Sequence, residues 1–140
     1  MVDGLCGSLF DKTPFAYGKA AEWSSRREEF VKRAAFALMA MLAGHDRKAP
    51  VASFERFLPI IEREAGDPRN FVRKAVNWAL RQIGKRNRGL NAKAIATAER
   101  IQASGVRSAK WVASDALREL RSNAVQARLR SRARARRSRP

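Results

Sequence analysis

FVKRAAFAL at residues 30–38 and FVRKAVNWA at residues 71–79 are two versions of one pattern, set about 40 residues apart. KAVNWALR at residues 74–81 matches WVASDALR at residues 111–118 at nearly the same interval. In each copy the apolar residues recur every three or four positions, which is the period of one face of an α-helix. Alternating apolar and polar residues, which would indicate strands, are almost absent. The sequence therefore predicts an all-α protein with an internal repeat.

A helix pair that recurs about every 40 residues is typical of HEAT and armadillo repeats. We therefore expect a HEAT-like α-solenoid of about three helix-pair repeats, in which the second helix of each pair lines one shared face. Pro59 is expected to kink its helix, whereas Asp67 and Asn91 are expected to cap helix N-termini. The predicted helices cover residues 2–10, 15–23, 27–42, 51–64, 68–86, 92–103, 109–120 and, as a possible extension, 122–130.

The composition excludes several kinds of site. The 140 residues include one cysteine and one histidine, so neither a disulfide framework nor a cysteine-based zinc site is expected. His45 lies in a loop rich in Lys, Gly and Pro, which argues against histidine-based catalysis. No apolar run is long enough for a membrane span, and the N-terminus lacks the basic region of a signal peptide. We expect a cytoplasmic protein without a metal or a small-molecule cofactor.

Positive charge is the first indication of a partner. Thirty Lys and Arg against 13 Asp and Glu give a net charge of +17, and nucleic acid is the commonest partner of such a surface. The sequence predicts one folded domain over residues 1–127 and a disordered, Arg-rich tail over residues 128–140. The tail is either a solubilising extension or an arm that binds phosphates.

The helix predicted over residues 68–86 carries a stripe of cations around one aromatic residue, on the side opposite its apolar face. Lys74, Trp78, Arg81 and Lys85 follow each other at helical spacing, as a phosphate-binding surface with a stacking platform requires. The alternative is that Trp78 belongs to the core and the cations are an ordinary solvated face.

The two other second helices carry cations as well. Lys110 and Arg118 lie on the polar side of the helix over residues 109–120, together with Trp111 and Asp115. Arg33 is the last charge before the apolar stretch 34–41, where a guanidinium should meet either a structural carboxylate or a bound anion. Lys74, Lys85, Lys110 and Arg118 are phosphate-binding candidates from their positions alone.

Four segments in order resemble a known family. RNFVRKAVNWALRQIGKRN at residues 69–87 is similar to the hallmark segment of the HEAT-like-repeat DNA alkylation repair enzymes, the alkylpurine DNA glycosylases of the AlkC/AlkD type. SLFDKTPFAY, EEFVKRAAFALMA and AKWVASDALREL, at residues 8–17, 28–40 and 109–120, resemble successive segments of the same proteins. The resemblance implies a monofunctional glycosylase that hydrolyses the N-glycosidic bond of cationic N3- and N7-alkylpurines in duplex DNA.

The resemblance also implies roles for particular residues. The family's catalytic aspartate falls on Asp3, which would stabilise the sugar cation and position the attacking water. The DNA-contacting arginine falls on Arg33, and the lesion-contacting tryptophan falls on Trp78. Arg81 is carried over as a structural or phosphate-contacting residue. Similar proteins have further helices before the aspartate, so the chain is expected to correspond to the C-terminal part of the family fold, with possible loss of activity.

The expected partner is duplex DNA that contains alkylated bases, bound by a monomer associated with the nucleoid. Two other functions stay open. One is a HEAT-repeat module that binds DNA or RNA without catalysis, and the other is a protein–protein interaction scaffold. Only the glycosylase requires Asp3.

Overall fold

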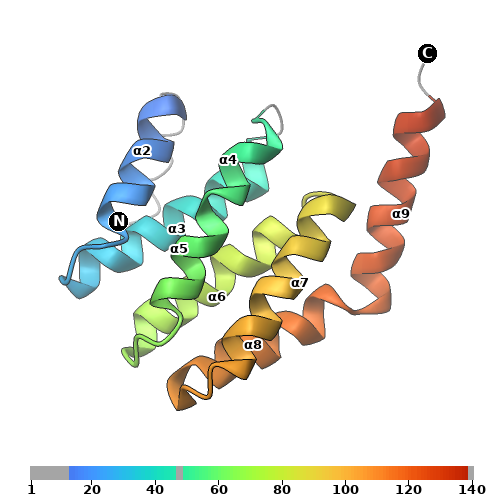
Figure 1. Cartoon of the computed structure of the whole chain (residues 1–140). Helices are drawn as coiled ribbons and strands as arrows, with labels where there is room; N and C mark the ends of the chain where they lie inside the picture. The colour runs from blue at the N-terminus through green and yellow to red at the C-terminus, as the bar shows by residue number, and fades with distance from the viewer. Residues whose placement is uncertain (1–12, 47–48, 139–140) are drawn as a thin grey trace.

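The structure is a computed structural model that describes residues 13–46 and 49–138. Within these residues there is no strand, which confirms the predicted all-α class. The helices are α2 (Thr13–Trp23), α3 (Glu29–His45), α4 (Val51–Glu55), α5 (Phe57–Glu64), α6 (Asn70–Gly84), α7 (Arg88–Ala103), α8 (Arg107–Leu120) and α9 (Asn123–Ser138) (Figure 1).

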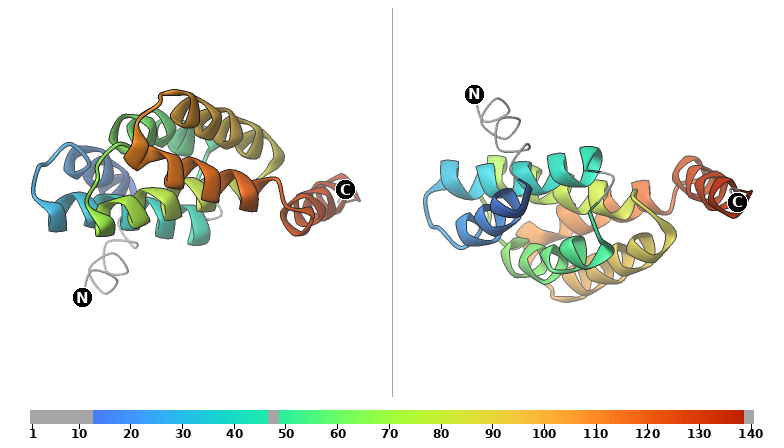
Figure 2. Two further views of the ribbon diagram at one scale, coloured as in Figure 1. Left: turned by 90° about the horizontal axis from the view of Figure 1, so that it is seen from below. Right: turned by 90° about the horizontal axis from the view of Figure 1, so that it is seen from above.

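The helices form two layers, and the repeat seen in the sequence generates them. α3, α6 and α8 lie side by side in one layer, whereas α2, α5 and α7 form the other (Figure 2). Each helix of the second layer packs on the helix that follows it in the chain, so α2–α3, α5–α6 and α7–α8 are the stacked pairs. This is the α-solenoid arrangement that the sequence predicts, and it places the three second helices on one shared face.

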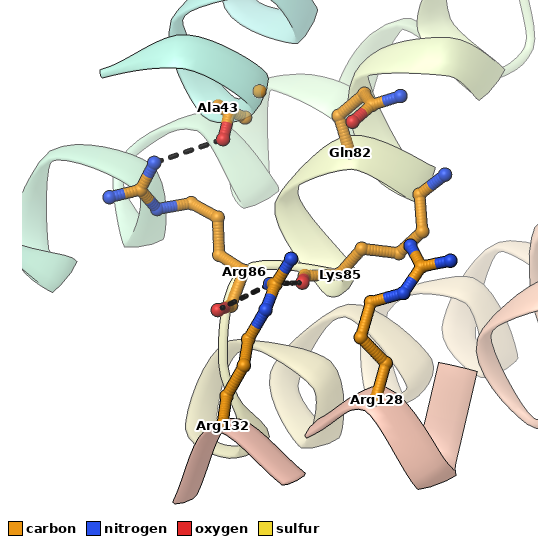
Figure 3. Close-up of a pocket in the computed structure, with 7 residues that line it drawn as sticks. Ala43, Gln82, Lys85, Arg86, Arg128 and Arg132 are labelled. Carbon is orange, nitrogen blue, oxygen red and sulfur yellow. Dashed lines mark hydrogen bonds between the residues drawn. The ribbon is translucent and has the colours of Figure 1, made fainter. Parts of the chain in front are cut away.

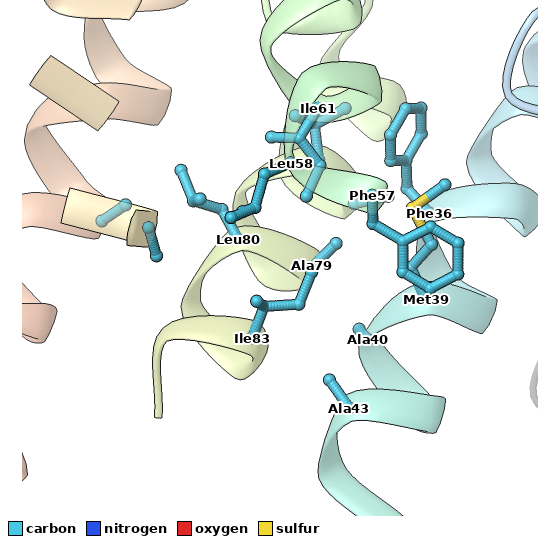
Figure 4. Close-up of a cluster of buried hydrophobic side chains, with 14 of the residues drawn as sticks. Phe36, Met39, Ala40, Ala43, Phe57, Leu58, Ile61, Ala79, Leu80 and Ile83 are labelled. Carbon is cyan, nitrogen blue, oxygen red and sulfur yellow. The ribbon is translucent and has the colours of Figure 1, made fainter. Parts of the chain in front are cut away.

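The core lies between the two layers. α3 is buried over most of its length, as its apolar stretch predicts, and α6 buries one face against it. Burying one large apolar side chain stabilises a fold by about 1.5–3 kcal/mol, so the apolar contact between α3 and α6 contributes strongly to stability. The side chains that meet there include Phe36, Met39, Ala40, Ala43, Phe57, Leu58, Ile61, Ala79, Leu80 and Ile83 (Figure 4).

Pro59 interrupts the helix predicted over residues 51–64, but the break lies before the proline. α4 ends at Glu55 and α5 begins at Phe57, with Arg56 between them. A proline cannot donate to the carbonyl four residues earlier and its ring crowds that carbonyl. Pro59 therefore lies in the first turn of α5, where a missing N–H costs nothing.

The predicted caps need correction at two helices. α7 begins after Asn87, whose side chain accepts a hydrogen bond from the Leu90 N–H at 2.8 Å, so Asn87 is the N-cap in place of Asn91. Asn91 lies inside α7 and is buried, where its amide donates to the carbonyls of Gly84 and Leu120. α6 begins at Asn70, so its N-cap is Arg69 and not Asp67; Asp67 accepts from the Arg69 N–H at 3.0 Å, just before the helix.

α6, α7 and α8 approach most closely at Gly84. A Cβ atom built at Gly84 would lie 2.5 Å and 2.8 Å from the two Cδ atoms of Leu120 and 3.1 Å from the Cβ of Ala94. The absence of a side chain there lets the end of α6 rest directly on its neighbours. The buried amide of Asn91 on α7 donates to carbonyls at the ends of α6 and α8 and so joins these two ends.

The C-terminal segment differs from the sequence prediction. Residues 128–138, where a disordered tail is expected, continue helix α9, which projects from the body of the protein (Figures 1 and 2). Ala and Arg are good helix formers, so the composition supports a helix once its start is fixed. Val125 and Leu129 are buried against the body and provide that anchor.

Candidate nucleic-acid interface

Three aromatic side chains are exposed on the helices of the shared face. Phe30 of α3, Phe71 of α6 and Trp111 of α8 keep 57%, 53% and 40% of their surface exposed. Phe30 and Phe71 occupy the same position in the repeat. Large aromatic residues are usually buried, so a set of exposed ones on one layer marks a surface suited to binding.

Two arginines stack on these rings and connect neighbouring helices. The guanidinium of Arg33 on α3 lies 5.0 Å from the ring centroid of Phe71 on α6. The guanidinium of Arg73 on α6 lies 5.2 Å from the ring of Trp111 on α8. Such a contact contributes about 0.5–1 kcal/mol at an exposed site. Each step between helices of this layer therefore carries a cation held against an aromatic ring.

The two basic residues of the FVKR segment point to opposite environments. Lys32 is buried, and its Nζ lies 2.6 Å from Glu64 Oε1 and 3.1 Å from Asp67 Oδ2. Arg33 is exposed and has no carboxylate partner in the described part of the chain. The second basic position of the segment is therefore the one that faces solvent. Lys74, at the corresponding position of α6, is exposed as well.

The cluster around Lys32 is structural. The Arg69 side chain, together with its N–H and Lys32, holds the pKa of Asp67 well below its ordinary value, despite the opposing effect of burial. Burial also raises the pKa of Glu64, but Lys32 and Arg63 more than offset it, so that pKa is lowered too. The five charges stay ionised and join α3 to the end of α5 and to the segment between α5 and α6.

A groove runs between α6 and α8. It has a volume of about 640 Å³ and brings together Lys74, Arg81 and Arg118, three of the residues that the sequence predicts as DNA-binding. Trp111 lines the same groove. Asp115 and Glu119 are the acidic residues that line it, so its cations outnumber its carboxylates.

Arg81 is fixed by its neighbours. Its Nε donates to Asn77 Oδ1 at 2.8 Å, and its Nη1 donates to Glu119 Oε2 at 3.1 Å. Asn77 in turn donates to the Val112 carbonyl of α8. Burial raises the pKa of Glu119, but Lys85 and Arg81 outweigh that effect, so its pKa lies below the ordinary value. The network joins α6 to α8, which favours a structural role for Arg81.

The structure places the other predicted site residues in different surroundings. Trp78 is half-buried and packs against the hydrophobic core, which favours the interpretation that it is a core residue. Lys110 is exposed on α8 without a carboxylate partner among the described residues, but it does not line the groove. Lys85 lies beyond the groove and pairs with Glu119 at 2.8 Å. Asp3 lies outside the described residues.

The exposed aromatics Phe30 and Phe71 were not among the predicted site residues. For Phe71 a signal is present in the sequence, because this residue lies next to the apolar face of its helix and not on it. Phe71 stands just before Val72, the first buried residue of α6, and so falls off the core-facing side. The pairing of Arg33 with Phe71 and of Arg73 with Trp111 depends on the stacking of the repeats and has no sequence signal.

Among residues 13–46 and 49–138, no group of three or more His, Cys, Asp or Glu side chains is arranged to hold a metal ion. No helix in the same residues has the length and apolar character needed to cross a membrane.

Comparison with known proteins agrees with a repair function. Residues 1–130 match the family described as DNA alkylation repair enzyme, and the chain belongs to this family. Membership supports a role in DNA alkylation repair and suggests enzyme activity. The comparison finds no match among curated proteins or solved structures.

Proposed function

We propose that the protein is a monofunctional DNA glycosylase that hydrolyses the N-glycosidic bond of cationic N3- and N7-alkylpurines in duplex DNA. The exposed aromatic rings of α3, α6 and α8, with arginines stacked on those of α6 and α8, are the observation that carries the proposal. Lys74, Lys110 and Arg33 supply cations without carboxylate partners among the described residues, so they are available to phosphates.

The chemistry suits a chain that has one histidine. An alkylated purine already carries a positive charge, and it leaves as a neutral base when the bond to the sugar breaks. No strong acid is then needed to protonate the leaving group. The barrier lies in the oxocarbenium-like sugar, which a carboxylate stabilises electrostatically while it positions the attacking water. In this proposal Asp3 provides that carboxylate.

The test is release of 7-methylguanine from methylated duplex DNA, measured by chromatography against an incubation without protein. We expect release by the wild type and its loss in Asp3→Asn. A wild type that releases no more base than spontaneous depurination contradicts the glycosylase assignment.

A second function is favoured by the charges of the groove. Its two carboxylates are both occupied, since Asp115 pairs with Arg118 at 2.6 Å and Glu119 pairs with Arg81 and Lys85. The groove therefore offers binding groups but no free carboxylate among the described residues that line it. This favours a module of the same family that binds DNA without cleaving the glycosidic bond.

Binding experiments separate the two functions. Both predict that Lys74→Gln weakens binding of a duplex and lowers its dependence on salt, because one phosphate contact is lost. Lys93→Gln is the control, since it removes the same charge from α7 in the opposite layer, where Lys93 pairs with Glu55 at 2.8 Å. If binding responds as expected while no base is released, the non-catalytic function stands. Equal effects of the two substitutions would rule out the α6–α8 groove as the binding surface.

A further inference from the structure

A second cationic cavity lies at the end of α6, where α9 passes beside it (Figure 3). The cavity, which we call the α9 pocket, has a volume of about 300 Å³. No acidic side chain among the described residues lines it. Its polar lining residues are Gln82, Lys85, Arg86, Arg128 and Arg132.

Three of the four cations are held in place by the ends of helices. Arg86 donates to the carbonyls of Ala43 and Asp46 at 2.9 Å and 2.7 Å, and its guanidinium lies over the ring of Phe54. Arg132 donates to the carbonyl of Lys85 at 2.9 Å. The ammonium of Lys85 pairs with Glu119 at 2.8 Å. These contacts hold the three side chains at defined positions along the walls of the pocket.

Arg128 is different from the other three. It projects from α9 toward the end of α6 (Figure 3), and its guanidinium has no hydrogen-bond or ion-pair partner in the described part of the chain. A guanidinium presents its N–H groups as a planar fork that matches two oxygens of a phosphate. The pocket thus contains an unused donor set of the type that binds phosphate.

The ends of α3 and α6 have an opposing effect, because the C-terminus of a helix carries about half a negative charge and disfavours an anion. Arg86 and Arg132 bind the carbonyls at these ends and largely cancel that effect. What is left is the positive charge of Arg128, because Lys85 is already paired with Glu119. The cations therefore prevail over the helix ends.

The α9 pocket continues the α6–α8 groove. Glu119 lines the groove and pairs with both Arg81, in the groove, and Lys85, in the pocket. Lys74 and Lys85 lie about 16 Å apart along α6, at 1.5 Å per residue. A DNA strand that lies on the groove can therefore reach the pocket with a later phosphate.

We propose that the α9 pocket binds a phosphate group, and that this group is a phosphodiester of the DNA held in the neighbouring groove. The inference rests on the proposed function for the source of the phosphate, but not for the chemistry of the pocket. It gives α9 a function: the helix closes the end of the cationic track and adds one phosphate contact beyond the repeats.

The test compares Arg128→Gln with Arg130→Gln in the full chain. Both residues are exposed on α9, and both substitutions remove one charge. Residue 130 is turned about 200° from residue 128 around the helix, and it lines a smaller cavity on another side of α9. Neither substitution breaks a contact within the described residues, so both variants are expected to fold.

Two probes are used, an unmodified 20-base-pair duplex followed by fluorescence anisotropy over a series of KCl concentrations, and inorganic phosphate followed by ³¹P line broadening. We expect Arg128→Gln to weaken duplex binding about three- to ten-fold and to lower the salt slope by about 1, with a smaller change for Arg130→Gln. If phosphate-induced broadening is lost in Arg128→Gln but kept in Arg130→Gln, phosphate binding in the α9 pocket is supported, even if the wild type fails to bind DNA. That failure would overturn the proposed function and the DNA source together.

Equal effects of the two variants on both probes overturn the inference, because α9 would then act only as a diffuse positive charge. An effect of Arg128→Gln on the duplex but not on inorganic phosphate supports a site that recognises the phosphate only as part of DNA. An effect on inorganic phosphate with unchanged duplex binding overturns the DNA source.

Discussion

Lys32 and Arg33 are adjacent cations in one segment of α3, yet they belong to two regions with opposite properties. Lys32 is enclosed with Glu64 and Asp67 at the seam between α3 and the α5–α6 connection. Arg33 lies on the shared face, over the exposed ring of Phe71. In the seam every charge has a partner, whereas on the face several cations have none among the described residues.

The comparison shows that a charge contributes to the fold or to binding according to its surroundings. Removing one member of a buried ion pair leaves an uncompensated charge, which strongly destabilises a protein. Removing an exposed cation changes stability little, because water already solvates it. The seam should therefore respond to substitution through stability, and the face through affinity for DNA.

The largest expected effect is that of Lys32→Met. It leaves Glu64 with Arg63 alone and Asp67 with Arg69 alone, so we expect the free energy of unfolding to fall by about 2 kcal/mol, measured by urea denaturation. Arg33→Met is the matched control, with the same new side chain one residue away, and should cost less than about 1 kcal/mol. Equal losses in the two variants would erase the distinction between seam and face.

Acid should weaken the seam by a smaller amount. Asp67 and Glu64 have pKa values lowered from 3.8 and 4.5 by Arg69, Lys32 and Arg63. A carboxyl group with a lowered pKa in the folded state stabilises the fold above its unfolded pKa and loses this contribution as the pH falls through the folded value. We expect the urea midpoint of the wild type to fall as the pH drops below about 4.5.

The same titration of Lys32→Met distinguishes the seam from the other carboxylates of the protein. Without Lys32 the two carboxyl groups gain less from being ionised, so their protonation should cost less stability. Parallel pH profiles for the wild type and Lys32→Met would mean that the seam is not the acid-sensitive element.

The smallest expected effect is on the face. Arg33→Ala should weaken binding of duplex DNA about three- to ten-fold and lower the salt slope by about 1, with little change in stability. Arg56→Ala, on the connection between α4 and α5 in the opposite layer, removes the same exposed charge and should leave binding nearly unchanged. The measurement is fluorescence anisotropy with a labelled duplex. A larger loss of affinity in Arg56→Ala than in Arg33→Ala would mean that DNA binds to the other layer.

Much of the fold could be predicted from the sequence. The repeat of the FVKR and FVRK segments gives the helix pairs, and the apolar stretch of α3 gives its buried position. The start of α7 was harder to predict, because Asn87 and Asn91 are equally good N-cap residues when the sequence is considered alone. Asn91 is buried where Gly84 packs against Leu120, and its amide donates to the carbonyls of both residues. This arrangement depends on how α6, α7 and α8 stack.

The candidate site could be predicted only in part. The helical spacing predicts Lys74 and Arg81 on one side of α6, and the stacking of α8 places Arg118 in the same groove; their role in binding stays a prediction. The spacing did not distinguish Trp78, which packs on the core, from Trp111, which is exposed. A tryptophan at the border of an apolar stripe can either pack against the core or be exposed to solvent. The position of the neighbouring helix determines which of the two occurs.

The sequence by itself determined the features that depend on the period of a helix: three stacked pairs, a cationic stripe along α6 and an excess of positive charge over the chain. Only the tertiary structure decided which cations stay available for a ligand. Lys32 meets carboxylates more than thirty residues away, and Arg132 bonds a carbonyl at the end of α6. Helical period is a local property of the chain, whereas the pairing of a charge depends on residues that only folding brings near.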